Sequence, residues 1–142
     1  MSDLEINNLL LALENEANSS IMNLTTSKIK TIKNNMLQRL QIGRGELKKL
    51  HKKLKGYRYC SDMNDVQYGH YIRWISLKNP DFIKLTNGGI IIDIDIIKDC
   101  VQIRVKNNRN QVFQIKLDEC CIFQKISQQE KVILGVLDYL EK

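Results

Sequence analysis

The feature that most constrains the fold is an alternation of apolar and polar residues that recurs in three successive segments, 90–97, 101–106 and 113–117. Alternation with period two predicts half-buried β-strands, because successive side chains of a strand point to opposite faces of the sheet. Turn-forming residues separate the segments, Lys98-Asp99 in one case and residues 107–110 in the other. The region therefore predicts an antiparallel meander.

The parities of these segments agree with one register, in which Ile94 pairs with Ile103 and Ile103 pairs with Ile115. A slip of one residue would turn a whole apolar face outward, so the register is strongly specified. The same register places Asp93 opposite Arg104 on the outer face. The residues expected on the buried face also include Ile90, Ile92, Ile96, Val105, Phe113 and Leu117, with Ile92 opposite Val105.

Three more segments are expected to extend this sheet. Residues 69–78 and 122–126 are rich in β-branched and aromatic residues, which favour strands. Residues 82–86 lead into Asn87-Gly88, which is a strong signal for a β-hairpin turn. We therefore expect residues 82–86 to pair with the segment that follows the turn.

Apolar residues before residue 57 recur at helical spacing instead. A short helix is expected near the N-terminus, followed by a helix cap or a turn at Asn18-Ser19-Ser20. Gly43 and Gly45 predict a break in the next helical stretch, and Gly56 predicts its end. The apolar row of that stretch consists of Ile29, Ile32, Met36, Leu40, Leu47, Leu50 and Leu54.

At the other end of the chain, Ser127 and Glu130 have the spacing of a capping box, which predicts a C-terminal helix that covers the sheet or plugs a barrel end. The whole chain is thus expected to be an α+β protein with N-terminal helices, a small antiparallel β-meander or SH3-like barrel, and a C-terminal helix. Residues 1–56 would form a helical basic arm, as a hairpin or coiled coil, and residues 57–142 a small β-domain closed by that helix.

Charge is distributed very unevenly along the chain, whose formal net charge is +6. Residues 1–27 carry a net charge of −4, residues 28–58 carry +10, and residues 59–142 are neutral. The basic excess is therefore confined to one predicted helical segment. Such a segment favours contact with nucleic acid, because neutralisation of phosphates is the main source of sequence-independent affinity.

Lysines outnumber arginines in this segment, which favours point-charge contact with phosphates over reading of base edges. Aromatic residues at Tyr57, Tyr59, Tyr68, Tyr71 and Trp74 follow it and could stack on the bases of single strands. The residues predicted to bind nucleic acid are Arg39, Arg44, Lys48, Lys49, Lys52, Lys53, Lys55, Tyr57, Arg58, Tyr59 and Arg73.

A second function class fits the same segment. The apolar row that ends at Leu54 is narrow enough to pair with another helix as a coiled coil, either in a homo-oligomer or against a partner protein. In this alternative the chain is a structural or interaction protein, and the lysines are only the solvated side of its helix.

Catalytic chemistry is not expected. The two histidines, His51 and His70, belong to no known catalytic spacing, and no phosphate-binding glycine loop is present. The carboxylates of Asp93 and Asp95 are interpreted as the solvated face of a strand.

The four cysteines, at positions 60, 100, 120 and 121, match no zinc-binding pattern and are expected to be free thiols. Cys60 and His70 are the one pair that could begin a metal site, and we expect no metal or cofactor. The sequence has neither a secretory signal nor an apolar run long enough to span a membrane. An intracellular location, or one inside a virion, is therefore expected.

Three segments carry a resemblance to a known group of proteins: Tyr68-Gly-His-Tyr-Ile-Arg-Trp-Ile75, Leu85-Thr-Asn-Gly-Gly89 and Ile122-Phe-Gln-Lys125. In these the chain resembles small uncharacterised proteins of nucleocytoplasmic large DNA viruses of the mimivirus type. The resemblance covers about residues 57–142. It implies a viral context, as a virion-associated or accessory protein in the host cytoplasm or nucleus, and a small β-domain without catalytic residues.

Overall fold

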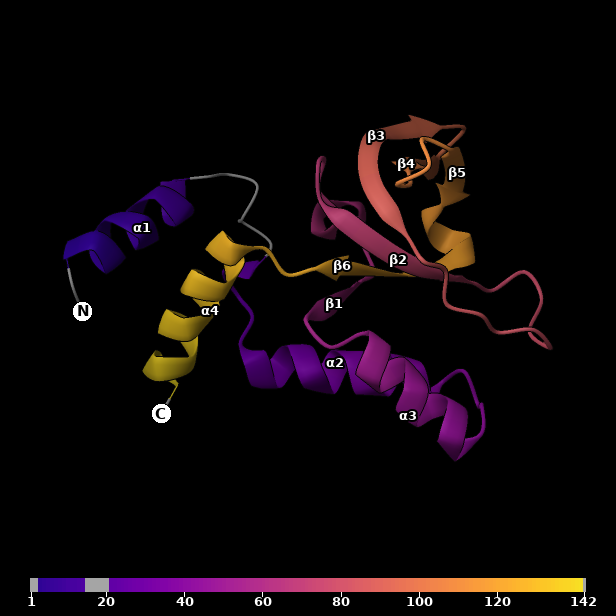
Figure 1. Cartoon of the computed structure of the whole chain (residues 1–142), viewed down its shortest axis with the longest axis horizontal. Coiled ribbons are helices and arrows are strands. Elements are labelled where there is room, and N and C mark those ends of the chain that lie inside the picture. The colour runs from indigo at the N-terminus through magenta and orange to yellow at the C-terminus, as the bar shows by residue number, and fades with distance from the viewer. Residues whose placement is uncertain (1–2, 15–20, 142) are drawn as a thin grey trace.

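The computed structural model describes residues 3–14 and 21–141. Within them the chain forms an α+β fold, as predicted, in which helices flank one antiparallel sheet (Figure 1). The elements are α1 (Asp3–Glu14), α2 (Thr26–Gln38), α3 (Arg44–Lys53), β1 (Tyr57–Cys60), η2 (Met63–Asp65), β2 (Tyr71–Ser76), β3 (Gly89–Ile97), β4 (Cys100–Lys106), β5 (Val112–Lys116), η3 (Leu117–Glu119), β6 (Cys120–Lys125) and α4 (Gln128–Leu140).

The sheet has the strand order β1-β6-β2-β3-β4-β5, so β6 is inserted between the first two strands. The predicted antiparallel meander is confirmed over β2, β3, β4 and β5, whereas its continuation into residues 122–126 is wrong, because β6 pairs with β1 and β2. The sheet bends so strongly that β3, β4 and β5 lie above β2 and β6 in Figure 1. One face of the sheet is consequently concave.

The predicted register is confirmed over most of its length. Ile94 pairs with Ile103, Asp93 with Arg104, and Ile103 with Ile115. The placement of Ile92 opposite Val105 is wrong, because the register shifts between Ile91 and Asp93 and Val105 pairs with Ile91. Such a bulge inserts one residue and reverses the parity beyond it, which explains why Ile91 is fully buried while Ile90 is 47% exposed.

The expected hairpin at Asn87-Gly88 is also wrong. Residues 82–86 do not pair with β3 but continue into it along the edge of β2. Leu85 forms a bridge with Ile75, and the Thr86 N–H donates to the Trp74 carbonyl at 3.0 Å. The segment is therefore extended where the sequence predicts a turn, because Leu85 is buried and Thr86 is hydrogen-bonded to β2.

Two glycines allow this close passage. Gly88 has a φ of +83°, and a Cβ atom on it would lie 2.0 Å from the Ile72 carbonyl oxygen. A Cβ atom on Gly89 would lie 2.5 Å from the Lys106 carbonyl oxygen. Neither distance is compatible with a side chain, so the passage of this segment between β2 and β4 depends on both glycines.

The helices α2 and α3 share a hydrophobic cluster with the sheet. Leu37 and Leu54 are fully buried against Phe123, Ile75 and Cys121, all of which belong to strands. The break between the two helices is confirmed, with α3 beginning after its N-cap Gly43. The boundary at residue 56 thus separates helices from strands, but the core is continuous across it.

The capping box that opens α4 is confirmed, since the Ser127 hydroxyl accepts from the Glu130 N–H at 3.1 Å and the Glu130 carboxylate from the Ser127 N–H at 3.0 Å. The expectation that this helix covers the sheet or plugs a barrel end is wrong. Instead Ile133 and Leu134 pack in a separate cluster with Ala12 of α1. The expected cap or turn at residues 18–20 lies outside the described residues.

Candidate nucleic-acid interface

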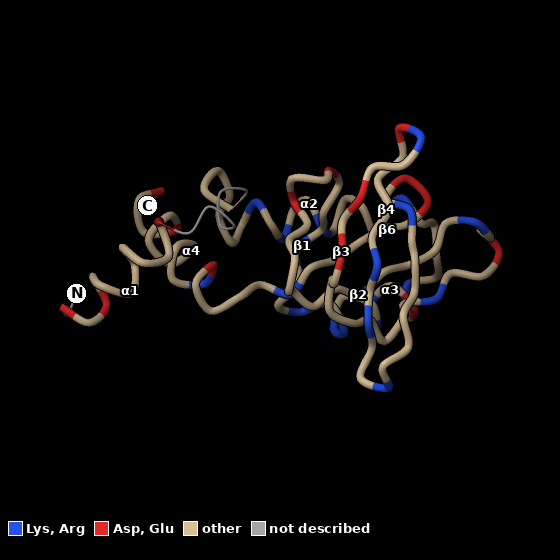
Figure 2. Tube along the Cα trace, turned by 90° about the horizontal axis from the view of Figure 1, so that it is seen from above, with Lys and Arg blue, Asp and Glu red and all other residues tan. Residues whose placement is uncertain are grey.

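The lysines of α3 are directed away from the core. Leu47 and Leu50 turn one side of this helix towards the sheet, which leaves the remaining sides in contact with solvent. Figure 2 shows Lys and Arg gathered over α2, α3 and the sheet, whereas the end formed by α1 and α4 carries mostly Asp and Glu. The predicted binding residues that are exposed are Arg39, Arg44, Lys48, Lys49, Lys52, Lys53 and Lys55.

Some of these cations line a groove between α3 and residues 80–87, with a volume of about 470 Å³. Lys49 and Lys53 of α3, Arg73 of β2 and Lys84 line it from three parts of the chain. Two carboxylates, Glu46 and Asp81, also line the groove, which is therefore net positive. We call this the basic groove.

The cations of the basic groove differ in the hydrogen bonds and ion pairs that they form within the protein. The Arg73 Nε donates to the Thr86 carbonyl at 2.8 Å, which fixes the guanidinium on the sheet side. Lys49 lies 3.4 Å from Glu46 in an exposed ion pair, which contributes little to stability. Among the ion pairs of the described residues, none involves Lys53 or Lys84. These two ammonium groups are well placed for an external anion.

A second row of cations on α3 lies outside the groove. Arg44, Lys48 and Lys52 follow one another at four-residue spacing and therefore share one side of the helix. They extend the positive surface from the groove around the outside of α3.

The prediction that Arg58 contacts nucleic acid is wrong. Its side chain is 2% exposed, and its Nε lies 3.2 Å from the Glu130 carboxylate, which is fully buried. The Arg58 Nη2 donates to the Asp65 carbonyl at 2.9 Å. A guanidinium enclosed in this way holds β1, η2 and the start of α4 together and does not reach solvent.

Tyr57 and Tyr59 do not form an open stacking platform either. Both pack against the cluster shared by the helices and the sheet, and the Tyr59 ring lies 5.7 Å from the Phe123 ring. Burial raises the pKa of both phenols above the usual value. The prediction that they form an open binding surface is therefore corrected, because both rings are partly buried against this cluster.

Trp74 belongs to a different core cluster, on the other face of β2, with Phe113 beside it. Trp74 is 7% exposed, and its indole ring lies 6.2 Å from the Phe113 ring in an edge-to-face arrangement. Tyr71 and Phe113 remain 37% and 42% exposed. The alternation assigns Phe113 to the core, so sequence reasoning misses its contribution to an open surface.

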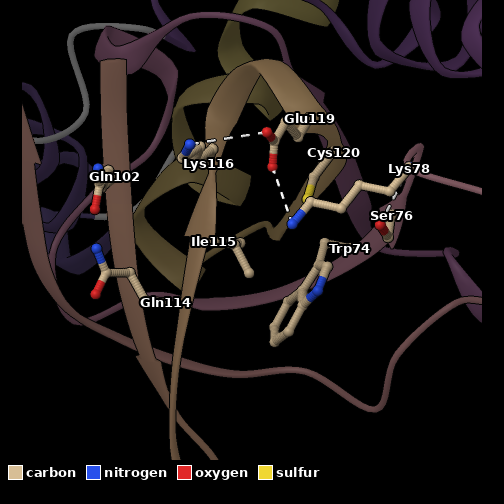
Figure 3. Close-up of a pocket in the computed structure, with 9 residues that line it drawn as sticks. All are labelled: Trp74, Ser76, Lys78, Gln102, Gln114, Ile115, Lys116, Glu119 and Cys120. Carbon is tan, nitrogen blue, oxygen red and sulfur yellow. Dashed lines mark hydrogen bonds and ion pairs between the residues drawn. The ribbon is translucent and has the colours of Figure 1, made fainter. Parts of the chain in front are cut away.

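A cavity of about 270 Å³ lies on one side of Trp74 (Figure 3). Both lysines that line it lie near the same carboxylate, because Glu119 is 3.3 Å from the Lys78 Nζ and 3.9 Å from the Lys116 Nζ. In the basic groove, by contrast, Lys53 and Lys84 take part in none of the ion pairs of the described residues.

Most of the residues expected to form a coiled coil pack against other residues of the same chain. Leu50 and Leu54 are buried against the sheet, and Leu37, which the predicted row omits, is fully buried with them. Ile32 of the predicted row is 41% exposed, because Lys33 and not Ile32 lies on the buried side of α2. The apolar side of α2 and α3 therefore serves as a cover for the sheet.

The described residues contain no cluster of three or more His, Cys, Asp or Glu that could hold a metal ion. The Cys60 thiol is buried beside Arg58, and this burial raises its pKa to about 12. His70 is turned towards Glu130, with 3.8 Å between its Nδ1 and the carboxylate.

In the part of the chain that is described, no helix is long and apolar enough to cross a membrane.

Comparisons with protein-family models, with curated proteins and with solved structures give no match for this chain. The viral context implied by the sequence resemblance stays a prediction. Any functional argument therefore depends on the surface itself.

Proposed function

We propose that this protein binds nucleic acid without sequence preference and without catalysis, through contacts between phosphates and the basic groove. The observation that supports this is the convergence of Lys49, Lys53, Arg73 and Lys84, from a helix, a strand and a loop, on one net-positive groove. Cations brought together from separate elements indicate a surface for an anionic ligand better than a charged helix does alone.

The composition of the groove favours phosphate over base contact. Three of its four cations are lysines, whose ammonium groups act as point charges and lack the rigid planar fork of arginine. Arg44, Lys48 and Lys52 on the outer side of α3 would contact further phosphates of the same strand or duplex. Affinity should then depend steeply on salt and only weakly on sequence.

The test is a titration of labelled DNA followed by fluorescence anisotropy at several salt concentrations. The triple variant Lys49→Gln, Lys53→Gln, Lys84→Gln should reduce the slope of log K against log salt by up to about 3 for duplex DNA, at ~0.9 for each phosphate that the variant no longer neutralises. The matched control is Lys98→Gln, Lys125→Gln, Lys131→Gln, which removes the same charge at exposed positions outside the groove.

Equal slopes for the two triple variants would contradict a specific role of the groove. A wild-type protein that binds neither single-stranded nor duplex DNA at about 50 mM salt would contradict the proposed function as a whole, because a basic surface of this size should bind strongly there.

One observation favours the interaction class as a second candidate. Leu4, Leu10 and Leu11 of α1 are 70%, 51% and 60% exposed, which leaves an apolar side of this helix in contact with solvent. A second copy of the chain could cover that side. Light scattering of the wild type and of the variant Leu4→Gln, Leu11→Gln tests this, since a dimer through α1 should become a monomer in the variant.

A further inference from the structure

A second cavity lies next to the basic groove. It has a volume of about 460 Å³, which is within the range of about 300 to 1,000 Å³ found for small-ligand sites. Asn87 lines both this cavity and the basic groove, so the two surfaces adjoin at this residue. Three aromatic side chains line the cavity: Tyr71, Trp74 and Phe113. We call it the aromatic pocket.

The rim of the aromatic pocket is polar and basic. The turn between β4 and β5 contributes Arg109, and the same turn is fixed by Asn107, whose side-chain oxygen accepts from the Arg109 N–H at 3.0 Å and the Gln111 N–H at 2.9 Å. The Tyr71 hydroxyl donates to the Asn87 carbonyl at 2.5 Å, which holds this ring at the boundary with the groove. The pocket thus combines three aromatic rings with the cation Arg109, and it adjoins the cations of the groove at Asn87.

This arrangement has the two parts that single-strand binding requires, a positive path for the backbone and aromatic rings for the bases. We propose, on the basis of the function proposed above, that the ligand of this surface is single-stranded nucleic acid. One unpaired base stacks in the aromatic pocket, while phosphates on its two sides contact the basic groove and Arg109.

The depth of the pocket argues against a duplex as the preferred ligand. Trp74 belongs to β2 and is only 7% exposed, so a base must leave its own stack to reach the indole. Bases of a duplex are paired and stacked, and unstacking them costs free energy. The basic groove alone would accept either form, so the preference for single strands comes from the pocket.

Trp74 is the single tryptophan of the chain and therefore reports on the pocket directly. The experiment is a titration of the full chain with a 20-nucleotide oligo-dT and with a 20-base-pair duplex, followed both by anisotropy of a labelled DNA and by tryptophan fluorescence. We expect tighter binding of oligo-dT, with a change in Trp74 fluorescence that the duplex does not produce.

Variants then test the role of the rings. Phe113→Leu and Tyr71→Leu should each weaken oligo-dT binding by about 5-fold to 150-fold, the range for removal of one base–aromatic stack. Duplex binding should change by less than about 2-fold, because it requires only the groove. Tyr71→Phe keeps the ring and should retain most of the affinity.

The matched control is Tyr139→Leu, which removes a ring that is 74% exposed on α4, outside the pocket. Thermal unfolding of each variant separates weaker binding from a weaker fold. If Phe113→Leu lowers the melting temperature, the comparison of oligo-dT with duplex within that one variant still isolates the stacking contribution.

The outcomes are distinguishable. Equal affinity for oligo-dT and duplex, with unchanged Trp74 fluorescence, would overturn the single-strand inference while leaving the proposed function in place. Absence of binding to both would overturn the two together. A preference for oligo-dT that survives Phe113→Leu and Tyr71→Leu would place the stacking elsewhere and also overturn the inference.

Discussion

The basic segment 28–58 contains two kinds of cation that its sequence does not distinguish. Lys33 and Arg58 are buried and bonded within the fold, the first to two carbonyl oxygens and the second to a carboxylate. The lysines of α3 are exposed along the outside of their helix. The difference lies in whether the fold places an acceptor opposite the cation, so the number of charges in a segment overestimates those available to a ligand.

The largest effect should come from separating the buried pair. Arg58→Met leaves the Glu130 carboxylate buried without the guanidinium that lies 3.2 Å away, and should lower the free energy of unfolding by about 3 to 5 kcal/mol. Urea denaturation followed by circular dichroism measures this. The control Arg44→Met, at an exposed position, should stay within about 0.5 kcal/mol of the wild type. Equal destabilisation of both variants would remove the distinction between the two kinds of cation.

The next effect concerns the helical arm as a part of the core. Leu37→Ala or Leu54→Ala removes a fully buried side chain that packs on the sheet, and each should cost about 2 to 5 kcal/mol. Leu11→Ala, which is 60% exposed in α1, is the control and should cost much less. For the same reason, a fragment of residues 57–142 should unfold without cooperativity. A cooperative fragment would support the two-part division that the sequence predicts.

A smaller effect is expected at Lys33, whose pKa burial lowers, with a further contribution from Lys30. Between that lowered pKa and the usual value of 10.5, the unfolded chain binds more protons than the folded one, so wild-type stability gains as pH rises. Lys33→Met removes this gain. It also leaves the Leu54 and Tyr57 carbonyls without their ammonium donor, at a cost of about 1 to 3 kcal/mol.

Chemical denaturation of wild type and Lys33→Met at pH 7 and at pH 10 measures both parts. The wild type should gain on the variant between the two pH values. A constant difference would mean that the Lys33 ammonium has the same pKa in the folded and unfolded chain.

The smallest effect on stability should accompany a large effect on binding. Replacing Lys48, Lys49, Lys52 and Lys53 by Gln should change the free energy of unfolding by no more than about 0.5 kcal/mol, since all four are exposed. The slope of log K against log salt for duplex DNA should nevertheless fall by up to about 4. A marked destabilisation of this variant would show that α3 depends on its lysines for structure as well.

The local pattern of apolar and polar residues is sufficient to predict much of this fold and part of the candidate interface. The alternation predicts the pairing of Ile94 with Ile103, and the apolar side of α3 predicts that its lysines are exposed. It does not predict the bulge beside Ile91, because a single inserted residue leaves no mark on the average period. The position of β6 beside β1 depends on contacts between segments that are distant in the sequence, and a local alternation of residues carries no information on such contacts.

The errors at the candidate site have the same origin. The sequence assigns Arg58 to the surface because its partner, Glu130, is 72 positions away. It does not assign Lys84 to the interface, because this residue joins the basic groove only when residues 80–87 fold back beside α3. Parity places Phe113 in the core, although the concave bend of the sheet leaves it 42% exposed.

Gly88 and Gly89, which lie between β2 and β4, limit how the aromatic pocket and the basic groove can change by mutation. Gly88 and its neighbour Asn87 line the aromatic pocket, and Asn87 also lines the basic groove. A mutation that adds even one methyl group at Gly88 or Gly89 would push the adjoining strands apart and deform both surfaces in a single step. The two surfaces are therefore expected to be inherited together or to disappear together, whereas the lysines of α3 can be exchanged one at a time.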